Sequence, residues 1–325
     1  MVTSTSLVTA KASTDLNLSL SDTDYNDIQY VVYNILGNGA GQSGYGRTLT
    51  SVPKVTGDII SHEEWATLKL DILKCAVHQG ISSLASITSL PTILEGQDIL
   101  VDHANVFIAA ANDIVTNKFL LGASQYSDEN LLTSTGVSIN QTRTTPWGSA
   151  SNPSISHAFT IDFGSSDNAR YFFNSGSSLR ISGNFDYTLN TPQNRAWGRL
   201  LSSFGIAIFN HTSTTADAGT AAPIGFYDLT TTDQTVFSVS GSGSYVVAAY
   251  GSNNYEIKAR CDVPNNINGG ARYMYVTILF HDYHEKVFPE QVSGTLNSYV
   301  AIRRSSGSYV SVQSPSATNT VLLTA

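Results

Sequence analysis

The first half of the chain carries apolar residues at the spacing of amphipathic helices. Ser21 and Asp24 stand three residues apart, as in a capping box, and Gly37 is placed to end the run. The apolar residues between them that share one helical face are Ile28, Val31, Val32 and Ile35. This pattern predicts a first helix between Ser21 and Gly37.

Two further helices are predicted. Ser61 and Glu64 form a capping-box pattern, and Gly80 stops the run that follows. The apolar stripe of this second helix is Trp65, Leu68, Ile72 and Cys75. A third stripe, over 97–117, contains Leu100, Ala104, Phe107, Ala111 and Ile114. Since an isolated helix cannot bury its stripe, the three pack together or against a partner chain.

The periodicity changes in the second half. Residues 122–155 are rich in Ser, Thr, Asn and Gly, which is typical of a linker. From His157 onward apolar and polar residues alternate, as in Phe159, Ile161 and Phe163. Short runs of this kind, separated by Gly, Pro, Asn and Asp, predict seven to nine strands in an antiparallel sandwich. The segment 196–208 is ambiguous, because its apolar spacing also fits a short helix on one sheet.

The predicted fold class is therefore α+β, with an N-terminal helical domain followed by a C-terminal antiparallel β-sandwich that is jelly-roll-like. Four segments are expected along the chain. They are an extended arm at 1–20, a helical assembly domain at 21–120, a linker at 121–155 and the sandwich at 156–325. An arm of this kind is either disordered alone or laid on a neighbour.

Composition narrows the class of protein. Charged residues make up only 13% of the chain and hydrophobic residues 41%, so the surface relies on uncharged polar side chains, and disorder is not expected. Such surfaces are typical of extracellular and viral β-proteins. The net charge of −8 argues against a nucleic-acid partner. Residues 1–150 hold 14 acids and 7 bases, and the remainder holds 11 and 10, so the two halves differ in kind.

The cysteine content and the lack of signal-peptide and membrane-spanning patterns indicate where the chain is made. Cys75 and Cys261 are the two cysteines, which excludes a disulfide scaffold and argues against a cysteine metal site. The polar N-terminus does not fit a signal peptide, and the apolar runs are too short for membrane insertion. We therefore expect a soluble chain made in a cytoplasm.

The motifs that could carry chemistry favour structural interpretations. Gly39–Gly44 has the letters of a dinucleotide fingerprint, but a predicted helix precedes it where a strand is needed. The run His281–Glu285 is the densest group of ligand-type side chains, although strand alternation would split it between two faces. No nucleophile elbow with a suitable context is present. We predict no catalytic residue, no cofactor and no metal, and hence no enzyme.

Several stretches are similar to a family of virion structural proteins from contractile-tailed phages of cyanobacteria and other marine bacteria. In the second half these stretches are Ala169–Gly176, Leu179–Ser182, Gly225–Thr231, Asn254–Arg260 and Val292–Tyr299. In the first half they are Asp24–Ile28, Asn34–Gly37, Gly44–Gly46, Trp65–Ile72 and His78–Gln79. The likeness covers about two thirds of the chain. The family often doubles the glycine at the position after Gly176, where this chain has Ser177.

This resemblance implies a component of the phage particle, in the tail, neck or baseplate region, with no enzymatic role. The expected location is the virion, assembled in the host cytoplasm. The expected partners are further copies of the chain, as a trimer or hexamer, and other virion proteins. The candidate assembly contacts are Ile28, Val32, Ile35, Trp65, Leu68 and Ile72. The alternative is that these residues form the core of the helical domain itself.

Two other functions stay open at this stage. A receptor- or glycan-binding module of the same particle would show exposed aromatic residues gathered on one face or one loop end of the sandwich. A polysaccharide hydrolase would need a cleft with two carboxylates about 5–10 Å apart. The sequence contains no motif for such a hydrolase.

Removal of the arm tests the assembly prediction. Deletion of residues 1–20 is expected to weaken self-association without unfolding the chain, because the arm adds no apolar stripe to the predicted core. Light scattering coupled to size exclusion measures the mass, and circular dichroism checks the fold. An unchanged oligomer would contradict the prediction.

Overall fold

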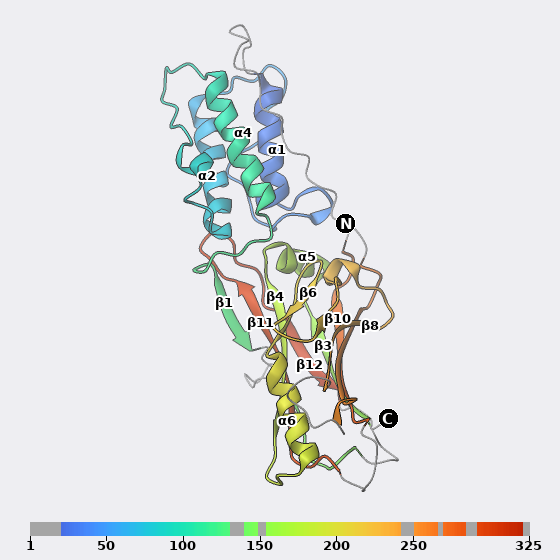
Figure 1. Cartoon of the computed structure of the whole chain (residues 1–325). Helices are drawn as coiled ribbons and strands as arrows, with labels where there is room; N and C mark the ends of the chain where they lie inside the picture. Colours follow the sequence, from blue (N-terminus) through green and yellow to red (C-terminus); the bar gives the residue numbers. More distant parts are fainter. Residues whose placement is uncertain are drawn as a thin grey trace. The chain divides into compact units, whose positions relative to one another are not determined.

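The computed structural model describes residues 21–130, 140–148, 154–241, 250–265, 269–283 and 291–320 (Figure 1). The predicted arm at 1–20 lies outside the described residues. The chain divides into two units. The helical unit comprises the chain up to residue 127 together with 170–177 and 304–312, and the sheet unit comprises 128–169, 178–303 and the chain from 313 onward.

Local capping signals mark the starts of two of the long helices and the end of one. The helical elements of the first half are α1 (Asp22–Leu36), η1 (Ala40–Gln42), α2 (His62–Gln79), α3 (Ala85–Thr88) and α4 (Val101–Thr116). Ser21 and Asp24 satisfy each other's backbone amides at the start of α1, and Ser61 and Glu64 do so at the start of α2. Gly80 ends α2 in the left-handed conformation. The first two predicted helices are confirmed, and the third begins later than 97.

The three long helices run parallel to one another. In the N-terminal half of each helix, the ring of Trp65 in α2 packs on the rings of Tyr25 in α1 and Phe107 in α4, with ring centroids 5.6 and 4.7 Å apart. At the other end, Gln79 donates to the carbonyl of Ile114 at 2.9 Å. Figure 1 shows the three helices starting at the same end of the unit. A parallel arrangement requires the connections before α2 and α4 to run back along the helices.

A buried carboxylate fixes the first of these connections. The carboxylate of Asp71 is fully buried and accepts hydrogen bonds from the backbone amides of Thr50 and Ser51, at 2.8 and 2.7 Å. Its other oxygen accepts from the Lys74 ammonium at 2.7 Å. An unpaired carboxylate would be costly at this depth, so these bonds hold residues 50 and 51 against α2.

Two segments from the second half of the sequence belong to the helical unit. Tyr171 donates to the side chain of Gln42 at 2.7 Å, and Asn174 donates to the carbonyls of Gln42 and Gly44. Gly46 has a positive φ, and a Cβ there would meet the Tyr171 ring at 2.5 Å. The boundary between the units is therefore not a single point in the sequence, unlike the four consecutive segments that the sequence predicts.

The sheet unit contains two antiparallel sheets. Its strands are β1 (Tyr126–Asn130), β2 (Asn140–Arg143), β3 (Ser154–Asp162), β4 (Ser178–Asp186), β5 (Ala207–Phe209), β6 (Thr214–Ala216), β7 (Thr220–Ala221), β8 (Gln234–Ser240), β9 (Asn254–Cys261), β10 (Tyr273–His281), β11 (Thr295–Ser305) and β12 (Ser316–Thr320). One sheet has the order β1-β11-β4-β5-β6, with β2 also on β11, and the other has β12-β3-β10-β9-β8-β7. The α+β class with a C-terminal sandwich is confirmed.

The segment expected as a linker, 121–155, contributes strands. β1 and β2 both lie beside β11, and β3 already starts at Ser154. In β1, Asp128 accepts two hydrogen bonds from Arg303 of β11, both at 2.8 Å. These bonds lower the pKa of the Asp128 carboxyl, against the opposing effect of partial burial. A polar strand at the edge of a sheet lacks the apolar alternation that marks a strand in sequence, so composition alone suggested a linker.

A helix packs on one sheet of the sheet unit, and a hydrogen bond joins the two sheets through the interior. The remaining helical elements of the chain are α5 (Ser166–Asn174), α6 (Pro192–Phe204) and η2 (Phe226–Asp228). The ambiguous segment at 196–208 is largely the helix α6, whose Phe204 ring stacks on Tyr255 of β9 at 4.7 Å. His157 of β3 and Ser298 of β11 bond at 2.9 Å, which joins the two sheets through the interior.

Close backbone contact between two glycines gives a test of the helical unit. A Cβ on Gly122 would lie 3.0 Å from the backbone of Gly80 and 3.2 Å from the His78 carbonyl oxygen. Gly122→Ala is expected to lower the free energy of unfolding by about 1–3 kcal/mol, measured by urea denaturation. Gly270→Ala is the matched control, because among the described residues a Cβ there meets only Val263, at 3.6 Å. Equal stability of the two variants would contradict this close packing.

Candidate interaction surface

The six predicted assembly contacts do not lie on a surface. Ile28, Val32, Ile35, Trp65, Leu68 and Ile72 are all 0–1% exposed and belong to the core cluster of the helical unit. A side chain at this depth cannot reach a partner while the unit stays folded. The structure therefore corrects this assignment. The helices bury their apolar stripes against one another, so any contact with a partner would use other residues.

Exposed apolar side chains are concentrated in the helical unit. Those of the described residues that belong to it are Tyr30, Val52, Val55, Ile59, Leu70, Leu84, Leu94, Leu100, Leu120 and Tyr309, whereas the sheet unit has Leu189, Val263 and Tyr283. Single exposed apolar residues are ordinary on protein surfaces. Among the described residues, the smaller helical unit thus carries ten of them against three on the larger sheet unit.

Five of these residues lie on the two connections that lead to the N-terminal ends of α2 and α4. We call them the helix-start surface, and they are Val52, Val55, Ile59, Leu94 and Leu100. Val55 and Ile59 are 70% and 85% exposed. Sequence reasoning missed Val52, Val55, Ile59 and Leu94 because they fall outside every helical stripe. It placed Leu100 in the third stripe, whereas the structure leaves this residue 53% exposed, just before α4 begins. The available signal was apolar residues beside turn-forming residues, such as Val55 before Gly57 and Leu94 before Gly96.

Hydrogen-bonded turns hold this surface in place. The amide of Asp58 donates to the carbonyl of Val55 at 3.0 Å, and the Asp58 carboxylate accepts from the Val55 amide at 3.1 Å. The second connection repeats the arrangement, with Gln97 bonded in the same two ways to Leu94. An apolar side chain therefore stands at the first position of each turn, where the turn presents it to solvent.

The surroundings of the helix-start surface are strongly acidic. Residues 22–27, 52–64 and 92–102 contain nine carboxylates and one lysine. That lysine, Lys54, pairs with Glu64 at 2.6 Å. Although partial burial acts in the opposite direction, bonds from Lys54 and Ser61 lower the pKa of Glu64 to about 2. Part of this charge serves the helices, since acids in the first turn offset the helix dipole.

The other end of the helices holds a buried polar network. The Tyr45 hydroxyl donates to the carbonyl of Lys118 and accepts from Gln79 at 2.9 Å. His78 bonds through Nε2 to the Ser175 carbonyl at 3.1 Å. Burial lowers the pKa of His78 to about 4, although the Ser175 bond opposes this shift, and burial lowers the pKa of Lys118 to about 8. These groups lie too deep to bind a macromolecule.

The sequence motifs with possible chemistry fall into structural roles. Gly39–Gly44 follows α1 and forms η1 and a turn, so it has no strand before it. Asp282 is buried and accepts from Trp197 at 3.2 Å, while Tyr283 is exposed. The last two residues of the run 281–285, residues 284 and 285, lie outside the described residues. Within the described part, no three His, Cys, Asp or Glu side chains converge as metal ligands.

Three tyrosines of the sheet unit with exposed or partly exposed rings lie at the two ends of β10. Tyr273 and Tyr275 lie on the outer side of β10, partly exposed, and Arg260 stacks on the Tyr275 ring at 4.1 Å. Beyond the end of the strand, the exposed ring of Tyr283 stacks on His281 at 5.2 Å. Arginine covers one face of Tyr275, so Tyr283 is the most accessible ring of the three.

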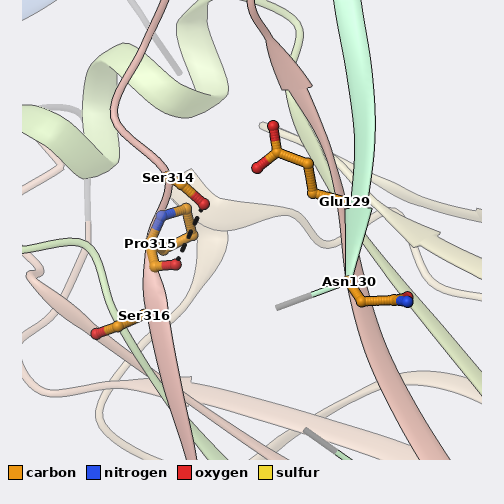
Figure 2. Close-up of a pocket in the computed structure, with 5 residues that line it drawn as sticks. All are labelled: Glu129, Asn130, Ser314, Pro315 and Ser316. Carbon is orange, nitrogen blue, oxygen red and sulfur yellow. Dashed lines mark hydrogen bonds between the residues drawn. The ribbon is translucent and has the colours of Figure 1, made fainter. Parts of the chain in front are cut away.

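One open hollow of about 350 Å³ lies between β1 and the chain entering β12 (Figure 2). It is lined by Glu129, Asn130, Ser314, Pro315 and Ser316. In Figure 2 the Glu129 carboxylate and the Asn130 amide point in different directions, and the Ser314 hydroxyl bonds to the Pro315 carbonyl instead of facing them. A single carboxylate in an open hollow does not provide the paired acids of a hydrolase.

Comparison with protein-family models, with curated proteins and with solved structures finds no match for this chain. No helix in the described ranges has both the length and the apolar character needed to cross a membrane.

The low pKa of His78 predicts a loss of stability in acid. In the unfolded chain His78 binds a proton below about pH 6.5, whereas in the folded chain it stays neutral down to about pH 4. The free energy of unfolding is therefore expected to fall by about 2 kcal/mol from pH 7 to pH 5, and His78→Gln should remove this part. Urea denaturation at both pH values measures it.

His62→Gln is the matched control for this experiment, because His62 starts the same helix far from the buried network. The comparison concerns the change with pH and not the absolute stability, so a variant that is weaker at both pH values still gives an answer. If His78→Gln keeps the full pH dependence of the natural chain, the burial of a neutral His78 is refuted.

Proposed function

We propose that this chain is a structural subunit of a tailed-phage virion, in the tail, neck or baseplate region, and that it acts by protein–protein assembly. The observation that carries the proposal is the concentration of exposed apolar side chains on the helical unit. The resemblance of ten short stretches to phage virion proteins supports it from a separate direction. The proposal assigns no catalytic step to the chain and requires no cofactor or metal.

The proposed mechanism is geometric. The helical unit has a core of its own, so it is a preformed body whose surface loops meet neighbours. Contacts that bury these loops gain free energy from the apolar area removed from water. A head-to-tail contact that closes on itself gives a ring, and a trimer or hexamer is the expected outcome. The virion, assembled in the host cytoplasm, is the proposed location.

A second candidate function is binding of a glycan on the host surface. The exposed ring of Tyr283 beyond the end of β10 favours it, because exposed rings stack on sugars. Arg260, stacked on Tyr275, leaves less ring surface than a dedicated sugar platform would have. Assembly therefore remains the leading proposal.

Two measurements test the proposed function. Light scattering coupled to size exclusion on the purified chain is expected to give a discrete trimer or hexamer. Antibodies against the purified chain should label one fixed region of phage particles in electron micrographs of a lysate in which the chain is produced. Particles that carry no label would overturn the proposal. Binding to a glycan array that is lost in Tyr283→Ser would favour the second candidate.

A further inference from the structure

The helix-start surface combines two properties that a free protein surface rarely has together. It presents five apolar side chains, two of them at least 70% exposed. Two of the five, Val55 and Leu94, open turns that are fixed by hydrogen bonds. The segments that carry them, with the start of α1, hold nine carboxylates and one lysine. This local excess equals the formal net charge of the whole chain, −8. The charge is thus concentrated where the apolar residues are.

Helix capping accounts for only part of this charge. Asp24 and Glu64 complete capping boxes, and Asp58 completes the turn at Val55. Glu95 and Asp98 lie in the connection before α4, are exposed, and form no ion pair within the described part of the chain. Carboxylates without a local structural partner, placed around exposed apolar side chains, fit a rim that pairs with charges on another molecule.

The sign of the charge selects the partner. A second copy that met this surface with its own helix-start surface would bring two strongly negative regions within a Debye length of each other. Nucleic acid and anionic lipid would be repelled for the same reason. A protein face with lysine or arginine around apolar residues complements this surface in its charge and in its apolar character.

We propose that the helix-start surface is the docking site for a different virion protein whose contacting face is basic and apolar. This inference rests on the proposed function for the identity of the neighbour as a virion protein. The apolar residues would supply the buried centre of the contact, and the carboxylates would supply its rim and its orientation. Contacts between copies of this chain would then use other parts of the molecule.

The probe is a short helical peptide with leucine on one face and lysine on the other. Two matched peptides replace every lysine by glutamate or every leucine by serine. Titration calorimetry at low and high salt measures binding to the full chain, and hydrogen exchange locates it. The lysine–leucine peptide is expected to bind, to protect residues 52–60 and 92–101, and to weaken about tenfold at high salt.

Two sets of substitutions separate the contributions. An apolar variant carries Val55→Ser, Ile59→Ser and Leu94→Ser, and a charge variant carries Glu95→Gln and Asp98→Asn. Each is expected to weaken the peptide about tenfold or more. Leu120→Ser is the control, because Leu120 is 51% exposed in the same unit but follows the opposite end of α4. Circular dichroism confirms that each variant folds.

The outcomes distinguish this inference from the proposed function. No binding, equal binding of the glutamate peptide, or protection elsewhere on the chain would overturn the docking site, whatever the particle labelling shows. Loss of the chain's own oligomer in the apolar variant would make a second copy the occupant, which also overturns it. Peptide binding at the predicted site with unlabelled particles would leave the basic partner in place and refute the virion role alone.

Discussion

The parallel packing of α1, α2 and α4 is the constraint on which the helical unit depends. Each helix buries its stripe against the other two, with Trp65 between Tyr25 and Phe107. Parallel neighbours cannot be joined by tight turns, so two long connections have to return along the bundle. Each connection ends at the start of the next helix, and there its backbone forms a turn from which single apolar side chains project. The same constraint gathers acids there, because three aligned helix dipoles favour negative charge at their N-terminal ends.

Burial and binding use different residues in this unit. The stripes that repeat every three or four positions are buried in the core, and most of the exposed apolar residues of the unit lie outside the helices. A stripe with the period of a helix is evidence that the helix packs against something. It does not show whether that neighbour is the same chain or another one. The exposed fraction of each side chain decides this, and it assigns Ile28 to the core and Ile59 to the surface.

The sheet unit contributes a rigid framework. β10 lies between β3 and β9 with a regular register over eight or nine residue pairs, and His157 and Ser298 tie the two sheets through the interior. Acids and bases are nearly balanced over 151–325, with 11 against 10, and some of them pair, as in the two hydrogen bonds that Arg272 donates to Asp162. The net charge is therefore concentrated in the first half, which is why the sequence shows two halves of different character.

The sequence by itself determined the helices with capping signals, the alternating strands and the α+β order, because these depend on neighbours within a few residues. It did not reveal that residues 170–177 and 304–312 complete the helical unit, or that 126–130 form a strand. Those placements depend on contacts such as Tyr171 with Gln42 and Asp128 with Arg303, whose partners are over 120 positions apart. The candidate surface was hidden for the same reason. Val55 and Leu94 have no pattern in sequence, and only the parallel packing of the helices brings their turns to one end of the unit.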